Sequence, residues 1–413
     1  MLVRLVAHFF RNSPVLALIG IGGLMVLVTL AGIFHQAHHC TSPDSIAYLR
    51  LAEQAYRTGS VYHIPGWSPG LHSTWPHAYS LAIGLFHALT GLSYLIASKL
   101  VNYFALAATL FLLYKKHGTR AWLVGLAFWA VVKVYAYTWS EPLYFFGLIW
   151  FAHTLHALLI EPAPRPGRWF ELYVAAVLVF ATRYIGFFTF GLVAALAGYG
   201  FWTRRLSLAW KAASVFTLLV ATAGFYFWLN EHHTGTFSGG ARGTWSDEPL
   251  NVFLKTWLRV QLNELLLIRD WNFTSFDGLA LAGLIFQLGM LGFVAQKLTH
   301  HPAGSVPRIA WGTPPLIALV YFAVALVFYC TFFTVRRLMP FNDLTYRTLC
   351  PATLFGLLGL LSWLTQRDEV FLRWKGTLLG FFFVVLLVSP LPATFRVSRV
   401  VEIVSRAFVR VKD

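Results

Sequence analysis

The stretch Thr41–Tyr62, TSPDSIAYLRLAEQAYRTGSVY, is the part of the chain from which the fold can be worked out. It follows an apolar run long enough to span a membrane, and it opens with Ser42-Pro43-Asp44. Residues 45–58 then have the apolar spacing of an amphipathic helix. The residues expected on its buried face are Tyr48, Leu51, Ala52 and Ala55. We therefore expect a helix at a membrane surface, with the carboxylate of Asp44 at its start.

Composition indicates an all-α polytopic membrane protein. Of the 413 residues, 58% are hydrophobic and only 12% are charged, whereas a soluble domain carries about 25% charged residues. The mean hydropathy is +0.64, and apolar runs of roughly 17–22 residues recur along the chain. Each run is long enough to cross a bilayer as a helix.

The net charge of +16 would suggest a nucleic-acid partner in a soluble protein. Here Lys and Arg fall in short segments between apolar runs, as is typical of cytoplasmic loops. We therefore expect membrane lipids, and no nucleic acid, as partners. The three cysteines have no disulfide or zinc spacing.

The basic clusters set the expected topology. Arg4 and Arg11 precede the first run and place its N-terminus in the cytoplasm, and Lys115 and Lys116 form the next cytoplasmic cluster. An odd number of spans must then separate the outer loop from that cluster, so we expect the short run 76–90 to be interfacial or re-entrant. The eleven expected spans are residues 13–34, 92–114, 121–137, 142–159, 170–182, 186–202, 208–229, 279–296, 314–334, 349–364 and 377–392.

One membrane domain is the simplest organisation. We divide it into a first span (13–34), an outer loop with interfacial helices (35–94), a helical module (95–229), a second outer loop (230–276) and C-terminal helices with a tail (277–413). Ten of the sixteen acids fall on the expected outer face. They are Asp44, Glu53, Glu141, Glu231, Asp247, Glu248, Glu264, Asp270, Asp277 and Asp343. Acids contribute little to topology, so this concentration favours a polar site on that face.

Two of these acids are candidates for catalysis. Asp44 at a helix start is consistent with a helix cap and equally with a fixed general base that acts on a hydroxyl. Glu141, in Ser140-Glu141-Pro142, lies where a span begins; this is an ordinary helix start but also a costly place to desolvate a charge.

Basic residues on the same face are candidates for phosphate binding. Arg336, Arg337 and Arg347 crowd one expected outer loop, 335–348, against the positive-inside tendency. Guanidinium groups bind phosphate through paired hydrogen bonds, although pairing with Asp343 or with anionic lipid would also explain them. Arg183, between two expected spans, is a weaker case of the same kind.

The remaining candidates lie in the two long outer loops. Arg242, in a Gly-rich segment, is either part of a plain connector or part of a lid over substrate. His63 and His77 belong to a group of outer histidines that could contact substrate. No pair has the spacing of a recognised metal motif, so we expect no metal cofactor; a divalent ion is an alternative that the pattern does not favour.

Several motifs together resemble the GT-C glycosyltransferases, specifically the protein-mannosyltransferase and aminoarabinose-transferase type. The motifs, in the family's order, are Pro43-Asp44-Ser45 with Tyr48-Leu49, Trp75-Pro76, Ser140-Glu141-Pro142-Leu143, Thr182-Arg183-Tyr184-Ile185-Gly186, the Gly-rich loop with Arg242, and Tyr346-Arg347 with Pro351. The resemblance implies a polyprenyl-phosphate sugar donor, Asp44 as base or acceptor-orienting carboxylate, Glu141 as a second acid near the reaction centre, and late-loop arginines on the donor phosphate. Ser45, where the family often has a second acid, weakens any metal role.

These inferences predict an inverting glycosyltransferase that acts on a lipid, glycan or protein acceptor at the outer, periplasmic face of a bacterial cytoplasmic membrane. Two other classes remain open. A lipid or solute transporter, including a flippase, should show charges near the membrane midplane and paired broken helices. A non-catalytic assembly protein should tolerate loss of Asp44 and Glu141.

Overall fold

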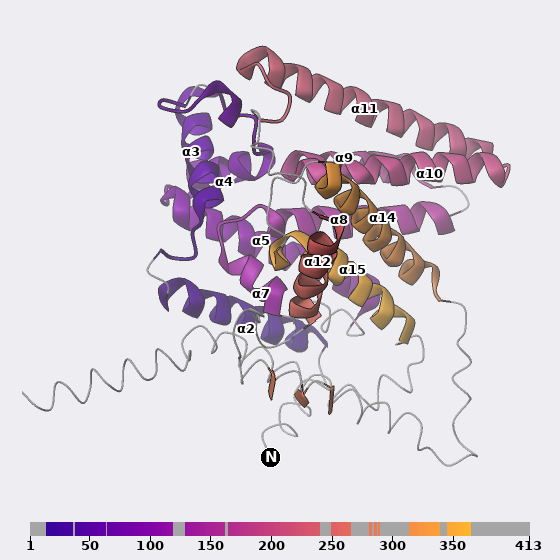
Figure 1. Ribbon diagram of the computed structural model, residues 1–413. Helices are drawn as coiled ribbons and strands as arrows, with labels where there is room; N and C mark the ends of the chain where they lie inside the picture. Colours follow the sequence, from indigo (N-terminus) through magenta and orange to yellow (C-terminus); the bar gives the residue numbers. More distant parts are fainter. Residues whose placement is uncertain are drawn as a thin grey trace, which may run out of the picture.

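The computed structural model describes residues 14–35, 38–62, 64–118, 129–161, 164–239, 249–265, 281–282, 285–286, 288–289, 314–338 and 345–364. These residues form helices and no strand (Figure 1). In chain order, the elements are α2 (Pro14–His35), α3 (Pro43–Thr58), η1 (Pro69–Leu71), α4 (Ala78–Thr90), α5 (Tyr94–His117), α7 (Trp129–Ala136), α8 (Glu141–Ile160), α9 (Pro166–Thr182), η2 (Tyr184–Phe187), α10 (Phe188–Trp202), α11 (Leu206–Thr234), α12 (Leu250–Leu265), α14 (Leu316–Leu338) and α15 (Tyr346–Leu364).

Five of the described helical segments are long and apolar enough to cross a membrane. They are Tyr94–His117, Glu141–Ile160, Tyr184–Trp202, Leu206–Thr234 and Leu316–Arg336. The expected all-α, multi-pass architecture is therefore confirmed. The expected span 377–392 and most of 279–296 lie outside the described residues.

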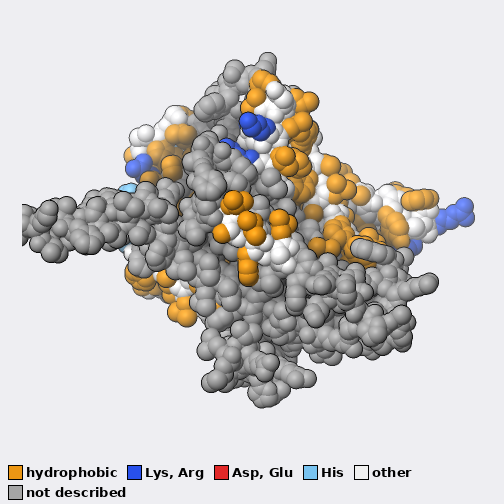
Figure 2. Space-filling view, turned by 60° about the horizontal axis from the view of Figure 1, so that its bottom comes forward, with side chains coloured by type: hydrophobic (Ala, Val, Ile, Leu, Met, Phe, Trp, Pro, Cys, Tyr) orange, Lys and Arg blue, Asp and Glu red, His pale blue; other side chains and the backbone are white. Residues whose placement is uncertain are grey.

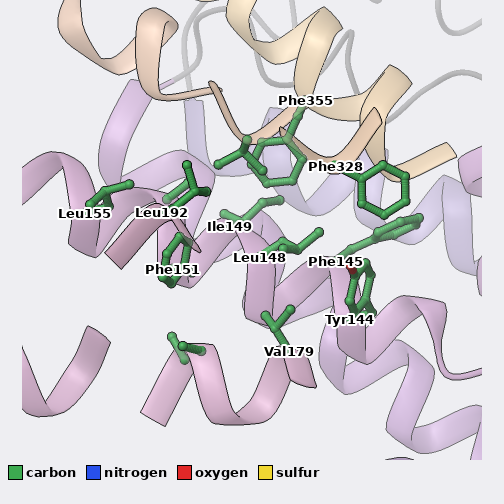
Figure 3. Packing of buried hydrophobic residues seen from close by; sticks show 14 of the residues in the cluster. Tyr144, Phe145, Leu148, Ile149, Phe151, Leu155, Val179, Leu192, Phe328 and Phe355 are labelled. Atoms are coloured by element: carbon green, nitrogen blue, oxygen red, sulfur yellow. The ribbon is translucent and has the colours of Figure 1, made fainter. Parts of the chain in front are cut away.

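Helix α8 forms the centre of the bundle because it is apolar on every side, as expected for a helix with no solvent-facing stripe. It packs against α5, α9 and α14. Figure 3 shows Tyr144, Phe145 and Leu148 of α8 among side chains of neighbouring helices, including Phe328 of α14 and Phe355 of α15. Because most of α8 is buried, the helix fixes its own first residue, Glu141, with respect to its neighbours.

The segment between α2 and α5 carries two short helices, α3 and α4, that pack on each other and on α5. Helix α3 begins at Pro43, two residues before the expected start, and buries Tyr48, Leu51 and Ala52 but leaves Ala55 only half-buried. Helix α4 has 13 residues, which is about 20 Å at 1.5 Å per residue and short of a bilayer core of about 30 Å.

Helices α10 and α11 form a long antiparallel pair at one side of the molecule (Figure 1). Much of α11 remains exposed, including Trp210, Leu218, Phe225 and Trp228. Hydrophobic side chains also cover most of the described surface on the face shown in Figure 2. An apolar exterior of this extent is typical of helices that face lipid.

Candidate active site

The start of α3 is capped by Ser42, so the expected capping role of Asp44 is wrong. The Ser45 amide donates to Ser42 Oγ at 3.4 Å, and the Ser42 amide donates to Ser45 Oγ at 2.9 Å, which together form a capping box. Asp44 lies one residue past Pro43, in the first turn. Because two serines satisfy the helix end, the carboxylate of Asp44 is available for contacts with other segments.

The turn before α8 fixes α3 in place. The indole of Trp139 donates to Ser42 Oγ at 2.8 Å, and the hydroxyls of Tyr48 and Ser140 are hydrogen-bonded at 2.9 Å. Burial, and then the negative charge of Glu141, raise the pKa of Tyr48 to about 12, so the phenol remains protonated at neutral pH. These contacts hold Asp44 and Glu141 on adjacent elements.

Helix α5 stabilises the same turn from the other side. The buried ammonium of Lys99 donates to the carbonyl of Ala136 at 2.8 Å, and the Asn102 amide donates to the carbonyl of Tyr137 at 2.6 Å. These carbonyls lie where α7 ends and would otherwise lack helical partners. These hydrogen bonds fix the backbone before α8 and so fix the positions of Ser140 and Glu141.

Glu141 is completely buried, and its carboxylate accepts hydrogen bonds from both Arg183 and Arg347. Arg183 directly follows Thr182, the last residue of α9, and is the C-cap of that helix. The turn that follows packs tightly, because a Cβ at Gly186 would lie 2.6 Å from backbone atoms of Val179. This close approach holds Arg183 at the end of α9, facing Glu141.

Arg347 joins the two carboxylates. It lies in the first turn of α15 and donates to Asp44 as well as to Glu141. Its guanidinium also lies over the ring of Trp139, 4.4 Å from the centroid, a typical cation–π distance. The site therefore contains two carboxylates and two guanidiniums, contributed by α3, α8, α9 and α15.

Exposure separates the roles of the charged groups. The side chain of Asp44 is 36% exposed, that of Arg347 17%, and that of Glu141 0%. Glu141 therefore holds the two guanidiniums from inside the protein, whereas Asp44 is the carboxylate that an incoming molecule can reach. The sequence had favoured Asp44 as the base and Glu141 as a second acid near it, but it gave no sign that Glu141 is buried and Asp44 is not.

A tryptophan from the segment between α3 and α4 completes the surroundings of Asp44. The indole N–H of Trp75 donates to Asp44 Oδ1 at 3.3 Å. Trp75 belongs to a motif quoted above, but no role was expected of it, and nothing in the sequence signals a role for Trp139. Ser42 directly before Pro43 has the usual pattern of a helix cap, a signal that could have identified its role. The contacts of all three residues with other segments depend on how those segments pack.

The buried side chain of His77 connects the segment between α3 and α4 to α11. Its Nε2 lies 3.1 Å from the carbonyl of His72, and its Nδ1 lies 3.1 Å from the hydroxyl of Tyr226. Burial lowers the pKa of His77 to about 4, so the ring is neutral, with Nε2 as donor and Nδ1 as acceptor. Both ring nitrogens are thus engaged within the protein.

Of the remaining candidates, the structure places Arg336 against α12, and the side chains of the others lie outside the described residues. The expected outer loop 335–348 is wrong at both ends, because α14 continues to Leu338 and α15 begins at Tyr346. The guanidinium of Arg336 lies over the ring of Phe253 on α12, 5.9 Å from its centroid. His63, Arg242 and the side chain of Arg337 lie outside the described residues.

Metal ligation has no support from the part of the chain that the structure describes. Within it, no group of three or more His, Cys, Asp or Glu side chains is placed to hold an ion. The carboxylates of Asp44 and Glu141 both accept from Arg347. Metal independence remains a prediction.

Comparison with known proteins identifies the fold. No family profile and no curated sequence matches the chain. The structure of ArnT from Cupriavidus metallidurans bound to undecaprenyl phosphate matches with a TM-score of 0.50 and 16% identity over 92% of this chain and 65% of that chain. The chain thus spans about two thirds of the length of that protein. The apo ArnT structure matches with a TM-score of 0.39 and 12% identity over 84% of this chain and 77% of that chain. This chain is a multi-pass α-helical membrane protein with the GT-C fold of ArnT.

Proposed function

We propose that this protein is a membrane glycosyltransferase that moves a sugar from a polyprenyl-phosphate donor to an acceptor hydroxyl of a lipid, glycan or protein. The observation that carries the proposal is the cluster in which Arg347 bridges the exposed carboxylate of Asp44 and the buried carboxylate of Glu141. The GT-C fold adds support, since ArnT with that fold was solved with undecaprenyl phosphate bound.

The reaction requires a base and a phosphate-binding group close together. Asp44 accepts the proton of the acceptor hydroxyl as its oxygen bonds to the anomeric carbon. The bond from that carbon to the phosphate oxygen breaks, and the phosphate leaves with the electron pair. Arg347 and Arg183 stabilise the added negative charge, because guanidinium groups bind phosphate through paired hydrogen bonds. A single displacement of this kind inverts the anomeric centre.

Glu141 acts in this scheme as a positioning residue. Its carboxylate is buried and binds both guanidiniums, so it sets their direction without contact with the sugar. The apolar spans around the site would hold the prenyl tail.

The charge distribution supports a location on the outer, periplasmic face of a bacterial cytoplasmic membrane. Glu141 begins α8, a helix of 20 residues that ends at Ile160, about 30 Å away. At that far end, Arg168 pairs with Glu161 at 3.6 Å, and Arg205 donates to the carbonyl of Leu159 at 3.2 Å. Basic residues at the end opposite the site follow the positive-inside tendency.

The test uses purified full-length protein in lipid nanodiscs. The donors are undecaprenyl phosphates that carry mannose, glucose or 4-amino-4-deoxyarabinose, and the acceptors come from membranes of the source organism with the gene deleted. We expect the wild type to convert one of these sugar-carrying lipids to undecaprenyl phosphate. The anomeric configuration of the product should be opposite to that of the donor.

The Asp44→Asn variant should lose at least about 100-fold in rate, as expected for loss of a general base. The matched control is Glu53→Gln, on the same helix but in an exposed pair with Arg57 at 2.8 Å, and it should keep the wild-type rate. Full activity of Asp44→Asn would overturn the mechanism. Failure of the wild type to consume any of the three donors would overturn the proposed function and favour a transporter or an assembly protein.

A further inference from the structure

Trp75 lies beside Asp44, Trp67 lies next to Trp75, and the proposed chemistry leaves both without a role. Trp67 and Trp75 are both half-buried, and their ring centroids lie 6.0 Å apart with the planes tilted by 47°. Trp75 also donates to Asp44 Oδ1 at 3.3 Å. The rings of Trp67 and Trp75 thus form an angled aromatic surface next to Asp44, which we call the aromatic wall.

The loop that carries this wall is held in one conformation. The Trp67 amide donates to the carbonyl of Ile64 at 3.1 Å, and the Trp67 ring lies 5.7 Å from that of His72. One residue later, the carbonyl of Ser73 accepts a hydrogen bond from the hydroxyl of Tyr184 at 2.7 Å. Tyr184 directly follows Arg183, so the aromatic wall and one phosphate-binding candidate belong to connected segments.

A second set of contacts fixes the wall to α11. The hydroxyl of Ser73 lies 3.2 Å from that of Thr234 and 2.9 Å from that of Thr236, and it accepts from the amide of Gly239 at 3.0 Å. His77 bonds to Tyr226 at 3.1 Å. A rigid platform loses little entropy when a ligand binds, which favours a binding role for these half-buried aromatic rings.

The chemistry of a sugar matches such a wall. The face of an aromatic ring is the negative part of its quadrupole, and it attracts the weakly positive C–H groups on one face of a pyranose. Tryptophans that only anchor a protein at the membrane interface place their N–H groups in the headgroup region. The N–H of Trp75 instead meets the carboxylate of Asp44, so this ring is oriented by the site itself.

We propose that Trp67 and Trp75 form the sugar subsite, a stacking platform for a pyranose whose anomeric carbon lies beside Asp44 and whose phosphate lies toward Arg347. This inference rests on the proposed function. It assigns recognition of the sugar to the loop between α3 and α4, and recognition of the phosphate to the arginines. Affinity for the two parts of the donor should therefore be separable by mutation.

The experiment compares two probes on the full-length protein in nanodiscs, by native mass spectrometry with titration. One is undecaprenyl phosphate, and the other is undecaprenyl phosphate that carries the sugar the wild type transfers. Trp67→Ala should weaken binding of the sugar-carrying lipid about tenfold, the size expected for one aromatic stacking contact. Binding of undecaprenyl phosphate without a sugar should be unchanged. Trp67→Phe should restore most of the loss.

Trp228→Ala is the matched control, because Trp228 is 54% exposed on α11, and both probes should bind it as they bind the wild type. Equal weakening of both probes by Trp67→Ala, or no weakening of either, would overturn the sugar subsite while the wild type still transfers sugar. If the wild type transferred a sugar from none of the sugar-carrying lipids, that result would instead overturn the proposed function, and the subsite with it.

Discussion

Arg347 donates a hydrogen bond to Asp44 across 303 residues of sequence. The contact joins the first turn of α15 to the first turn of α3, and the same guanidinium also binds Glu141 of α8. A single arginine thus connects an exposed carboxylate, a buried carboxylate and three helix starts. Four predictions follow from this arrangement and from the packing that supports it.

Arg347→Lys should lower kcat/KM by at least about tenfold despite the conserved charge. A lysine presents a point charge and cannot reproduce a planar fork that serves two carboxylates and lies over the ring of Trp139. Steady-state kinetics with the sugar-carrying lipid would measure the fall in kcat/KM. Arg57→Lys, on the exposed face of α3, is the control, and an unaffected Arg347→Lys variant would show that geometry at this position is unimportant.

Glu141→Gln should destabilise the protein by about 3 kcal/mol, since removal of one partner from a buried ion pair leaves charge uncompensated. Glu141 is fully buried, and its partners Arg183 and Arg347 are 23% and 17% exposed. Thermal unfolding in detergent would show the shift. Asp44→Asn, at a side chain that is 36% exposed, should lower the melting temperature much less; a reversed order would contradict the assignment of Glu141 as the anchor.

Gly186→Ala should destabilise the turn that carries Arg183. The added Cβ would meet the backbone of Val179 at 2.6 Å, and rigid backbone cannot move aside, so we expect a cost of about 1–3 kcal/mol. Donor affinity should fall with it as Arg183 shifts. Gly191→Ala in α10 is the control, since nothing lies within 4 Å of its Cβ; unfolding midpoints of the two variants would separate a steric effect from a general effect of alanine.

Stability should fall in acid because of His77. Its pKa is about 4 in the folded protein and about 6.5 when unfolded, so the unfolded chain binds the proton more tightly. The stabilisation is complete above about pH 6.5 and is lost as the pH falls toward 4, by up to about 3 kcal/mol. Melting temperatures between pH 7 and pH 4 would record this loss.

The pH dependence has its own control. His77→Gln should flatten the curve between pH 7 and pH 4, whereas the substitution His232→Gln, at an exposed position on α11, should leave it unchanged. A wild-type curve that is already flat in this range would show that His77 titrates normally.

Local sequence determined the class of the molecule and the position of each helix start near the site. Long apolar runs with few charges predict membrane helices because burial of polar backbone in lipid allows little else. The sequence also predicted that Asp44 and Glu141 lie at helix starts, and both lie in the first turn of a helix. The predictions were wrong where the same local sequence is compatible with several helix caps or helix ends. Ser42 caps α3 in place of Asp44, and α14 continues past the expected boundary of the loop.

Only the tertiary structure decided which groups meet. Arg183 and Glu141 are 42 residues apart, Arg347 and Glu141 are 206 apart, and Tyr62 and Asn230, joined at 2.8 Å, are 168 apart. Helix packing brings such groups together, and packing depends on the shapes of facing side chains, which composition and spacing do not encode. For the same reason the sequence alone identified the acids and arginines as candidates, and the fold determined that Glu141 holds the arginines, that Asp44 remains accessible, and that Trp75 lies against it.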